Sequence, residues 1–377
     1  MHPQTDHQTR LVISNYDSPK NPYYAGGGAF AVLKIATGLQ KMGFRVLVMA
    51  GKYPGCLNER IDGVEYRYVG SGNFGPKLGQ LAYQLSLISL IFRLPFDIWL
   101  ESFTPPFSTT CLPLFTNKPV IGSVHMLAGE DMQRKYHLPF KLAENLGLKT
   151  YSYIHVTSDQ IRQLVHSKTP GSKIQVIPNG IDIPVLPKKP VSGNYILFIG
   201  RIEINQKGLD LLLRAYSLLL PGYSGRLVIA GSGTAAEVSA LKLMIGRLGL
   251  SDRVILPGRV TGREKFALFV SADLVVVPSR FETFSFAALE VLAYQKPLVT
   301  FDIDGLKWVP ADCCLKTACF DVHALSRHIQ NILNNPRQSK VLAQKGRKFA
   351  KNFSWNQIIN SYAVYLSSVQ KNYGTSA

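Results

Sequence analysis

The sequence predicts an α/β protein made of two Rossmann-like halves, each a doubly wound parallel sheet. Short apolar runs alternate with segments in which apolar residues recur at helical spacing, as in residues 29–42. The alternation stops at residues 183–193, IPVLPKKPVSG, where three prolines and two lysines interrupt it. It then restarts, and a chain of 377 residues is long enough for two hydrophobic cores.

The elements can be placed in chain order. In the first half, a helix is expected at 29–42 and strands at 10–14, 45–50, 119–124, 153–157 and 173–177. In the second half, helices are expected at 208–220 and 353–369 and strands at 195–199, 226–230, 254–256, 274–278 and 297–301. The expected division is a first domain at 1–183, a linker at 184–194, a second domain at 195–352 and a C-terminal segment at 353–377 whose helix crosses back to the first domain.

The charge of the chain suggests an anionic partner. The formal net charge is +18, which favours nucleotide phosphates or an anionic membrane surface, the alternative being an ordinary solvated basic surface. Nucleic acid is not expected, because no basic run is interleaved with aromatic residues. The five cysteines are odd in number and irregularly spaced, which predicts reduced thiols and no metal site.

No segment is expected to cross a membrane. The most apolar stretch, residues 81–100, is interrupted by Gln84, Arg93, Pro95 and Asp97. A spanning helix needs roughly 20 uninterrupted apolar residues. The N-terminus has no apolar core of signal-peptide length. We therefore expect a cytoplasmic protein that is soluble or peripheral on the inner face of a membrane.

Two glutamates in the second half are candidates for ligand binding. Glu282 and Glu290 bracket the segment ETFSFAALE, which follows a predicted buried strand and runs into an apolar helix. Eight positions are slightly over two helical turns, so the two residues are expected to lie nearly in line. Glu282 is expected at or just before the helix start, where the exposed amides of residues 283–286 can bind a phosphate. The alternative is a capping acid and an unrelated surface glutamate.

Two cations on one loop are candidates for a diphosphate site. Gly200 and Arg201 end a strand, and Lys207 with Gly208 opens the next helix. An arginine can bind a phosphate with two hydrogen bonds, while a lysine contributes a point charge. Without the neighbouring motifs, the pair would be read as solvated loop charges.

Three motifs in the first half are weaker. The loop at 26–28 is Gly-Gly-Gly between a strand and a helix, which allows a phosphate to approach the backbone but lacks the dinucleotide fingerprint. His125 ends a predicted strand and is expected to point toward the ligand edge of the sheet, although single histidines are often structural. The turn IPNGID at 177–182 closes this half.

Together these motifs resemble glycosyltransferase family 4, which has the GT-B fold. The order and spacing agree across about residues 8–370, and the matching motifs within this range begin with Gly27 and Gly28 and end with Glu290. The resemblance implies two Rossmann-like domains facing across a cleft, with the acceptor on the first domain and the nucleotide-sugar donor on the second. The matching donor residues are Gly200, Arg201, Lys207, Gly231, Arg259, Val260, Glu282, Phe284, Ser285, Phe286 and Glu290.

The same resemblance implies a role for each residue. Arg201 and Lys207 would hold the diphosphate, and Glu290 would bind the ribose. Glu282 and the amides of residues 284–286 would bind the sugar, and His125 would contact it from the first domain. The loop 258–260 would meet the nucleobase. The implied catalytic residues are therefore His125, Arg201, Lys207 and Glu282, and the implied reaction retains the anomeric configuration without a metal or cofactor.

Some positions depart from the family pattern. Ser285 and Gln295 stand where relatives usually have glycine, and Asp304 replaces the first residue of a Gly-Gly pair. The side chain of Ser285 is expected to narrow the donor pocket. Asp302 and Asp304 also spell D-x-D, a metal motif of another transferase fold, but the context differs and we interpret it as chance.

The function expected from the sequence is transfer of a hexosyl group from a UDP- or GDP-sugar to an acceptor hydroxyl. The expected acceptor is a glycan or a lipid-linked sugar in cell-surface polysaccharide or glycolipid synthesis. One alternative is a non-catalytic GT-B subunit that binds a nucleotide or scaffolds a partner. Another is a sugar isomerase or phosphorylase, which the absence of a cofactor-binding lysine signature disfavours.

Overall fold

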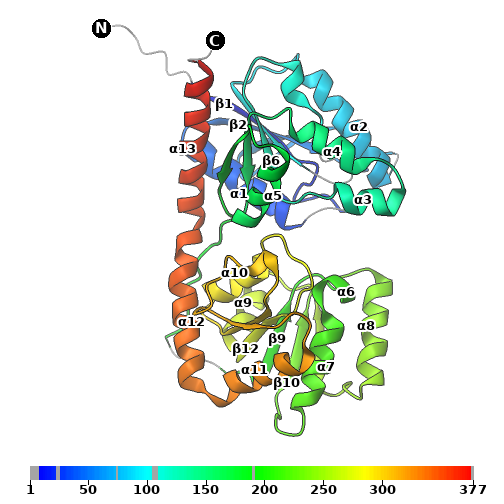
Figure 1. Cartoon of the computed structure of the whole chain (residues 1–377), viewed down its shortest axis with the longest axis vertical. Coiled ribbons are helices and arrows are strands. Elements are labelled where there is room, and N and C mark those ends of the chain that lie inside the picture. Colours follow the sequence, from blue (N-terminus) through cyan, green and yellow to red (C-terminus); the bar gives the residue numbers. More distant parts are fainter. Residues whose placement is uncertain (1–7, 23–25, 74, 104–108, 189–191, 375–377) are drawn as a thin grey trace. The chain divides into compact units, whose positions relative to one another are not determined.

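The computed structural model describes residues 8–22, 26–73, 75–103, 109–188 and 192–374. The chain divides into two compact units (Figure 1). The first unit combines Met1–Gly180 with Trp355–Ala377, and the second is Ile181–Ser354. The first unit contains a largely parallel sheet and the second a wholly parallel one, and helices pack on both sheets. This arrangement confirms the predicted fold class.

The first unit is built on an eight-stranded sheet in the order β3-β4-β2-β1-β5-β6-β7-β8. Neighbouring strands are parallel except for the antiparallel pair of β3 and β4. The central strands β5, β6 and β7 are buried over their whole length, as parallel strands covered on both faces must be. The strands are β1 (Arg10–Ser14), β2 (Arg45–Gly51), β3 (Glu59–Ile61), β4 (Val64–Val69), β5 (Ile98–Ser102), β6 (Val120–Val124), β7 (Tyr153–Val156) and β8 (Lys173–Val176).

The C-terminal helix α13 (Trp355–Gly374, red in Figure 1) belongs to this first unit. It packs along α1, where the side chain of Ile359 lies directly over Gly38. The other helices of the unit are α1 (Gly27–Lys41), α2 (Gly75–Leu90), the short 3-10 helix η1 (Leu112–Phe115), α3 (Gly129–Tyr136), α4 (Phe140–Leu148) and α5 (Asp159–Lys168).

The second unit is built on a six-stranded parallel sheet in the order β11-β10-β9-β12-β13-β14. The chain moves outward from β9 in one direction and then returns to add β12 on the other side. The topological switch point therefore lies between β9 and β12, which is where open α/β sheets bind ligands. The strands are β9 (Tyr195–Ile199), β10 (Arg226–Ala230), β11 (Val254–Gly258), β12 (Leu274–Val277), β13 (Leu298–Phe301) and β14 (Leu315–Thr317).

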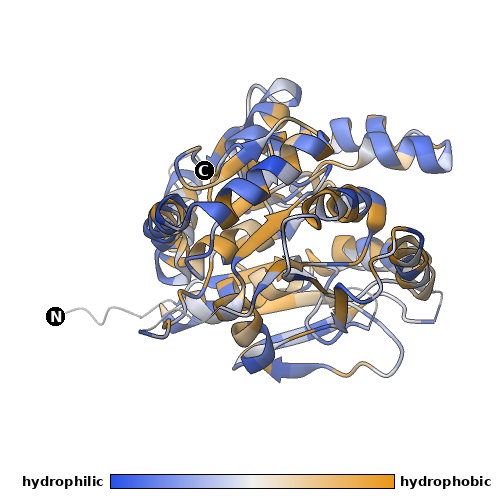
Figure 2. Cartoon of the chain, turned by 90° about the horizontal axis from the view of Figure 1, so that it is seen from below, coloured by the Kyte–Doolittle hydropathy of each residue, from blue (hydrophilic) through white to orange (hydrophobic). Residues whose placement is uncertain are grey.

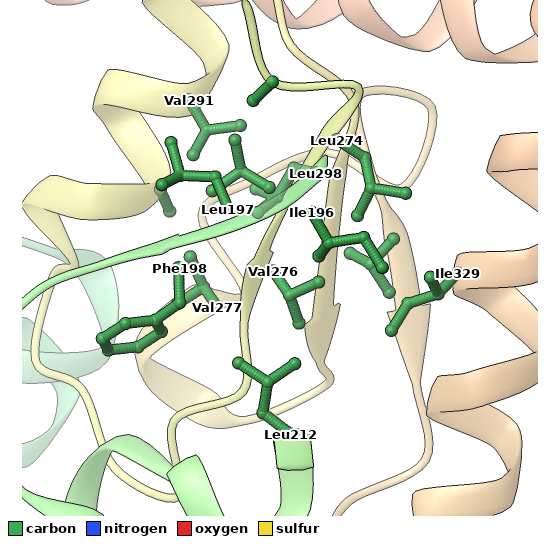
Figure 3. Packing of buried hydrophobic residues seen from close by; sticks show 14 of the residues in the cluster. Ile196, Leu197, Phe198, Leu212, Leu274, Val276, Val277, Val291, Leu298 and Ile329 are labelled. Atoms are coloured by element: carbon green, nitrogen blue, oxygen red, sulfur yellow. The ribbon is translucent and has the colours of Figure 1, made fainter. Parts of the chain in front are cut away.

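Aliphatic side chains from both sides of this sheet form the second core (Figure 3). Leu197 and Val276, on the neighbouring strands β9 and β12, are completely buried, as is Ile329 of α11. The strands are mainly apolar and the outward helix faces mainly polar (Figure 2). The helices are α6 (Ile204–Lys207), α7 (Leu209–Leu219), α8 (Ala235–Arg247), α9 (Gly262–Ser271), α10 (Phe286–Ala293), η2 (Asp304–Leu306), α11 (Val322–Asn334), α12 (Pro336–Ala350) and η3 (Lys351–Phe353).

All ten predicted strands are present, but β3, β4, β5 and β14 were not predicted. β5 is obscured in the sequence because it follows α2 within a single apolar stretch, so the change from helical to strand periodicity is hidden. None of the described helices combines the length and apolar character that crossing a bilayer requires.

Candidate functional site

The loops at the carboxyl ends of β9, β10 and β11 are joined through their backbones. Gly200 N donates to Ala230 O at 3.0 Å, and Gly231 N donates to Gly258 O at 2.8 Å. A Cβ atom on Gly231 would lie 1.7 Å from Gly200 O, so a larger residue cannot occupy this position without moving the loops apart. The predicted positions Gly200 and Gly231 therefore let the two loops approach closely beside the switch point.

The loop after β9 is also held against the loop after β12. Gly208 has a φ of +63°, and a Cβ there would lie 1.9 Å from Pro278 O. Arg280 reaches back with its backbone N to Gln206 O at 2.9 Å. Its guanidinium forms two hydrogen bonds of 2.7 Å with Asp210. This bidentate contact fixes the geometry between the two loops that flank the switch point.

Lys207 and Glu282 meet across this junction. Lys207 Nζ donates to Glu282 Oε1 at 2.7 Å, and Ser279 Oγ donates to the same oxygen at 2.7 Å. The side chains of Lys207 and Glu282 are 16% and 10% exposed. Two residues 75 positions apart in the chain thus form a largely buried ion pair at the edge of the sheet. If an anionic ligand replaced Glu282 as the partner of Lys207, the Glu282 carboxylate would be able to accept hydrogen bonds from ligand hydroxyls.

Arg201 lies on the same loop but is far more exposed. Its Nε lies 3.3 Å from Glu203 Oε2, and its side chain is 65% exposed. The guanidinium retains four further N–H donors in addition to Nε. The loop therefore carries one cation that is held in place and one that can turn toward a ligand.

The helix α10 begins after Glu282. Its first residue is Phe286 and its N-cap is Ser285, so Glu282 lies in the loop before the helix and not within its first turn. Ser285 has a φ of 40°, a left-handed conformation that glycine adopts more easily. Its Oγ accepts from Ala288 N at 3.3 Å, and this cap offsets part of the backbone cost. The hydroxyl is thus directed toward the helix amides, and the residue is 6% exposed.

The neighbouring phenylalanines pack within the second unit. Phe284 is buried and stacks on Trp308 with ring centroids 4.7 Å apart, and Phe286 contacts its edge at 6.1 Å. The Phe284 side chain is therefore occupied by packing, which leaves its backbone amide, the group that the family resemblance implies, for any contact with a ligand.

Glu290 has a partner that sequence reasoning missed. Lys265 of α9 places Nζ 2.5 Å from Glu290 Oε1. Burial raises the pKa of Glu290, while the charge and hydrogen bond of Lys265 lower it. Arg259 and Val260, in the loop that leads into α9, are exposed and buried respectively. The only sequence signal for Lys265 was its position in a helix that follows this loop, which does not reveal a partner 25 residues away.

The predicted residues of the first unit lie at the carboxyl edge of its own sheet. α1 begins at Gly27, its N-cap Gly26 provides no side-chain hydrogen bond, and Gly28 follows in the first turn. A Cβ on Gly28 would lie 3.8 Å from a carboxyl oxygen of Asp17, whose pKa burial raises to about 6. Because the N-cap is a glycine, no side chain of the described residues caps the backbone amides at the start of α1.

His125 follows β6 and makes a contact that the sequence did not predict. Its Nε2 lies 3.3 Å from Ser123 Oγ, and Ser123 Oγ lies 2.9 Å from Nδ1 of the buried His155 on β7. Burial lowers the pKa of His125 to about 4. Glu130 and Asp131, which follow on α3, form exposed ion pairs with Lys141 and Arg134.

Potential metal ligands are dispersed. Asp302 and Asp304 of the D-x-D segment lie near Lys316 and Lys307, at 3.7 and 2.5 Å. Within the described part of the chain, no group of three or more histidine, cysteine, aspartate or glutamate side chains is arranged to hold a metal ion.

Two protein-family models match the chain side by side. The model for glycosyl transferases group 1 matches residues 183–349, and the model for glycosyltransferase family 4 matches residues 25–184. A glycosyltransferase of Methanocaldococcus jannaschii is 34% identical over 178 residues, which are 42% of this chain and 45% of that protein. A glycogen synthase of Mycobacterium tuberculosis is 31% identical over 221 residues, 56% of this chain and 52% of the relative. The chain spans about half the length of the curated relatives it matches.

Solved structures share the fold over nearly the whole chain. Sucrose-phosphate synthase from Thermosynechococcus elongatus has a TM-score of 0.79 at 19% identity, covering 98% of this chain and 100% of that one. HepE of Anabaena in complex with UDP and glucose has a TM-score of 0.74 at 18% identity, covering 96% and 100%. At these identities the likeness establishes the fold.

Proposed function

Because the chain belongs to glycosyltransferase family 4 and has the GT-B fold, we propose that it is a retaining hexosyltransferase that needs no metal. It moves a hexosyl group from a UDP- or GDP-sugar to an acceptor hydroxyl. The acceptor is a lipid-linked sugar or glycolipid in cell-surface polysaccharide or glycolipid synthesis. The observation that carries the proposal is the ion pair of Lys207 and Glu282 at the switch point between β9 and β12.

The two cations of the β9 loop bind the diphosphate of the donor. The leaving nucleoside diphosphate develops negative charge in the transition state, and cations fixed in a partly buried site stabilise that charge. Lys207 is already held in place by Glu282, whereas the exposed Arg201 closes onto the phosphates when the donor arrives. Binding of the diphosphate replaces the carboxylate as the partner of Lys207.

The two glutamates recognise the sugar and the ribose. Glu282, released from Lys207, accepts hydrogen bonds from hydroxyls of the transferred sugar, and the amides of residues 284–286 donate to the donor. Glu290 accepts from the ribose hydroxyls, as acidic residues do in other nucleotide sites. His125 contacts the transferred sugar from the first unit. HepE of Anabaena, whose solved complexes contain UDP, glucose and UDP-glucose, supports a nucleotide-sugar donor.

Retention follows from attack on the same face of the anomeric carbon. The leaving phosphate accepts the proton of the acceptor hydroxyl, so no protein side chain becomes covalently attached. The contacts of Glu282 support this assignment. Ser279 Oγ donates to Glu282 Oε1 at 2.7 Å, a contact that does not involve Lys207 and that reduces the nucleophilicity of the carboxylate when Lys207 binds the diphosphate.

The proposal can be tested with a panel of UDP-, GDP- and ADP-sugars. Binding is read as a shift in the melting temperature, and turnover as release of the nucleoside diphosphate with and without EDTA. We expect one base to stabilise the protein and one sugar to be hydrolysed or transferred, with no loss of activity in EDTA. A panel that gives neither stabilisation nor turnover would contradict the transferase, and stabilisation without any turnover would favour a non-catalytic nucleotide-binding subunit. NMR of the product's anomeric proton decides between retention and inversion.

We propose in addition that the first unit docks on an anionic membrane, where a lipid-linked acceptor is found. The supporting feature is an exposed apolar surface, the α2–η1 face, made of Leu78, Leu81, Leu85, Phe92, Leu114 and Phe115. Phe92 and Phe115 are in ring contact at 6.2 Å, which joins the two parts of the face. Arg93 directly follows Phe92 in the chain and is exposed, and the exposed Lys118, three positions after Phe115, donates its Nζ to Phe96 O at 2.7 Å. Apolar side chains with flanking cations match the interfacial region of an anionic bilayer.

A further inference from the structure

A buried hydrogen-bonded chain runs through the first unit behind His125. Ser123 of β6 and His155 of β7 are 2% and 0% exposed. Ser123 Oγ lies 2.9 Å from His155 Nδ1 and 3.3 Å from His125 Nε2. The other ring nitrogen of His155, Nε2, lies 2.9 Å from Ile177 O. His155 is thus hydrogen-bonded on both sides, although neither it nor Ser123 has a role in the proposed reaction.

The carbonyl of Ile177 determines the tautomer of His155. A carbonyl oxygen can only accept, so Nε2 of His155 must carry the proton that it donates at 2.9 Å. The opposite tautomer would place two acceptors against each other at this distance. The Tyr362 hydroxyl of α13, 3.0 Å from the same Nε2, shares this donor. Burial lowers the pKa of His155 to about 3, so the ring is neutral and Nδ1 carries no proton.

The tautomer of His155 in turn determines that of His125. A serine hydroxyl has one proton, and Ser123 must donate it to the unprotonated Nδ1 of His155. The oxygen of Ser123 can then only accept from His125, so Nε2 of His125 carries a proton. Burial keeps the His125 ring neutral by lowering its pKa to about 4. Its Nδ1 is therefore an acceptor, and none of the described residues donates a hydrogen bond to it.

We propose that His155 is a positioning residue that, through Ser123, holds His125 in the Nε2–H tautomer and presents His125 Nδ1 as an acceptor for a hydroxyl of the transferred sugar. The second part rests on the proposed function. A neutral nitrogen acceptor attracts a hydroxyl and repels a carboxylate, so the arrangement favours a neutral hexosyl donor over an acidic one. The tautomer itself needs no ligand to be present.

Two substitutions separate the two hydrogen bonds of His155. In His155→Asn, the side-chain oxygen takes the place of Nδ1 and still accepts from Ser123. In His155→Gln, the longer amide takes the place of Nε2 and donates to Ile177, but the acceptor that faces Ser123 is lost. The Ser123 hydroxyl is then free to donate to His125 Nε2, which converts His125 to the Nδ1–H tautomer.

The readout is the nitrogen chemical shifts of His125 in protein labelled with ¹⁵N-histidine, assigned by comparison with His125→Gln. We expect an unprotonated Nδ1 in the wild type and in His155→Asn, and a protonated Nδ1 in a substantial fraction of His155→Gln. Ser123→Ala, a small change in a buried strand, is expected to give a mixture of His125 tautomers. This variant replaces His155→Gln in the test if His155→Gln does not fold. A protonated Nδ1 in the wild type, or the same tautomer in all three variants, would overturn the relay.

Kinetics with the donor identified in the panel test the functional part. We expect kcat/KM to fall about tenfold in His155→Gln, as for loss of one hydrogen bond, with UDP affinity unchanged and with most of the activity retained in His155→Asn. Equal kcat/KM values in the Asn and Gln variants would overturn the positioning role. If the expected tautomers are seen but no donor is turned over, the proposed function fails while the relay stands.

Discussion

Lys265 Nζ lies 2.5 Å from Oε1 of Glu290, and this ion pair joins α9 to α10 beside the loop that contains Arg259. The carboxylate of Glu290 is partly buried, and burial raises its pKa while Lys265 lowers it. The ionised form, which is the stronger acceptor for ribose hydroxyls, therefore depends on a residue that would not itself contact the nucleotide.

We expect Lys265→Met to raise the pKa of Glu290 further, so that the carboxyl becomes protonated at a higher pH. The affinity for UDP should then begin to fall at a higher pH in the variant than in the wild type as the solution is acidified. Isothermal titration calorimetry between pH 5 and 8 measures this, with Lys265→Arg as the control that keeps the charge. An unchanged pH dependence would show that Lys265 does not control the ionisation of Glu290.

Replacing Glu290 and replacing Glu282 should have different effects on nucleotide binding and sugar transfer. Glu290→Ala is expected to weaken UDP or GDP binding by about 10- to 100-fold, as for loss of hydrogen bonds to a charged acceptor. Glu282→Ala is expected to leave nucleotide binding within a few-fold and to abolish sugar transfer, because its predicted partners are on the sugar. Calorimetry with the free nucleotide and turnover with the nucleotide-sugar separate these effects. Equal losses of nucleotide affinity in both variants would contradict the division of roles.

Gly208 should not tolerate a side chain. Gly208→Ala places a methyl group 1.9 Å from Pro278 O at a φ of +63°, so the β9 and β12 loops must separate. We expect a loss of about 2 kcal/mol or more in the free energy of unfolding and weaker donor binding. Gly246→Ala in α8 is the matched control, because nothing lies within 4 Å of its added methyl group. That control should be neutral or slightly stabilising in denaturant unfolding, since alanine favours helix.

His155 should make the stability of the first unit sensitive to pH. Its pKa is lowered from 6.5 to about 3 on folding, so the unfolded chain takes up a proton at a higher pH than the folded one. The titration of His155 therefore leaves the free energy of unfolding unchanged above pH 6.5 and decreases it as the pH falls below that value. At pH 5 the loss is about 2 kcal/mol. In His155→Asn this titration is absent.

The free energy of unfolding of the wild type relative to His155→Asn should therefore fall by about 2 kcal/mol between pH 7 and pH 5. Because the two proteins are compared at each pH, the opposing titration of Asp17 largely cancels. Urea unfolding followed by circular dichroism provides the measurement. A difference that stays constant over this range would mean that His155 is not held neutral by the fold.

The α2–η1 face can be tested by adding one charge. Leu85, which is 60% exposed, is replaced by glutamate, and Leu243 of α8, which is 63% exposed in the second unit, receives the same change as control. We expect Leu85→Glu to weaken binding to vesicles containing phosphatidylglycerol about tenfold or more, since burying a leucine contributes about 2 kcal/mol. Leu243→Glu should bind like the wild type. No vesicle binding by the wild type at low salt, or equal losses in both variants, would rule out this face.

The sequence predicted the architecture well because strand and helix periodicities are strong in buried elements. It could not separate β5 from α2, since both lie in one apolar stretch, and it missed β4 although the alternation VEYRYV was visible. It placed Glu282 at or just before the start of α10 but did not locate the boundary itself, which lies between Ser285 and Phe286. That boundary depends on a left-handed serine, which no propensity argument anticipates.

Partners distant in the chain were the harder part of the candidate site. Lys207 and Glu282 were both selected from their motifs, but their contact depends on strand order, which places β9 beside β12. Lys265 and His155 belong to no recognised motif. Each acquires its importance from one neighbour, Glu290 or Ser123, that only the folded chain brings within reach.

The return of α13 to the first unit also sets the order in which the protein can be completed during synthesis. The second unit is one continuous segment, Ile181–Ser354, and all of it leaves the ribosome before α13 does. Until α13 has been made, the first 180 residues lack the helix that packs on α1 and that places Tyr362 beside His155. The half of the chain that is made first is therefore completed last, and a chain truncated near residue 354 would contain the whole second unit attached to a first unit that lacks α13.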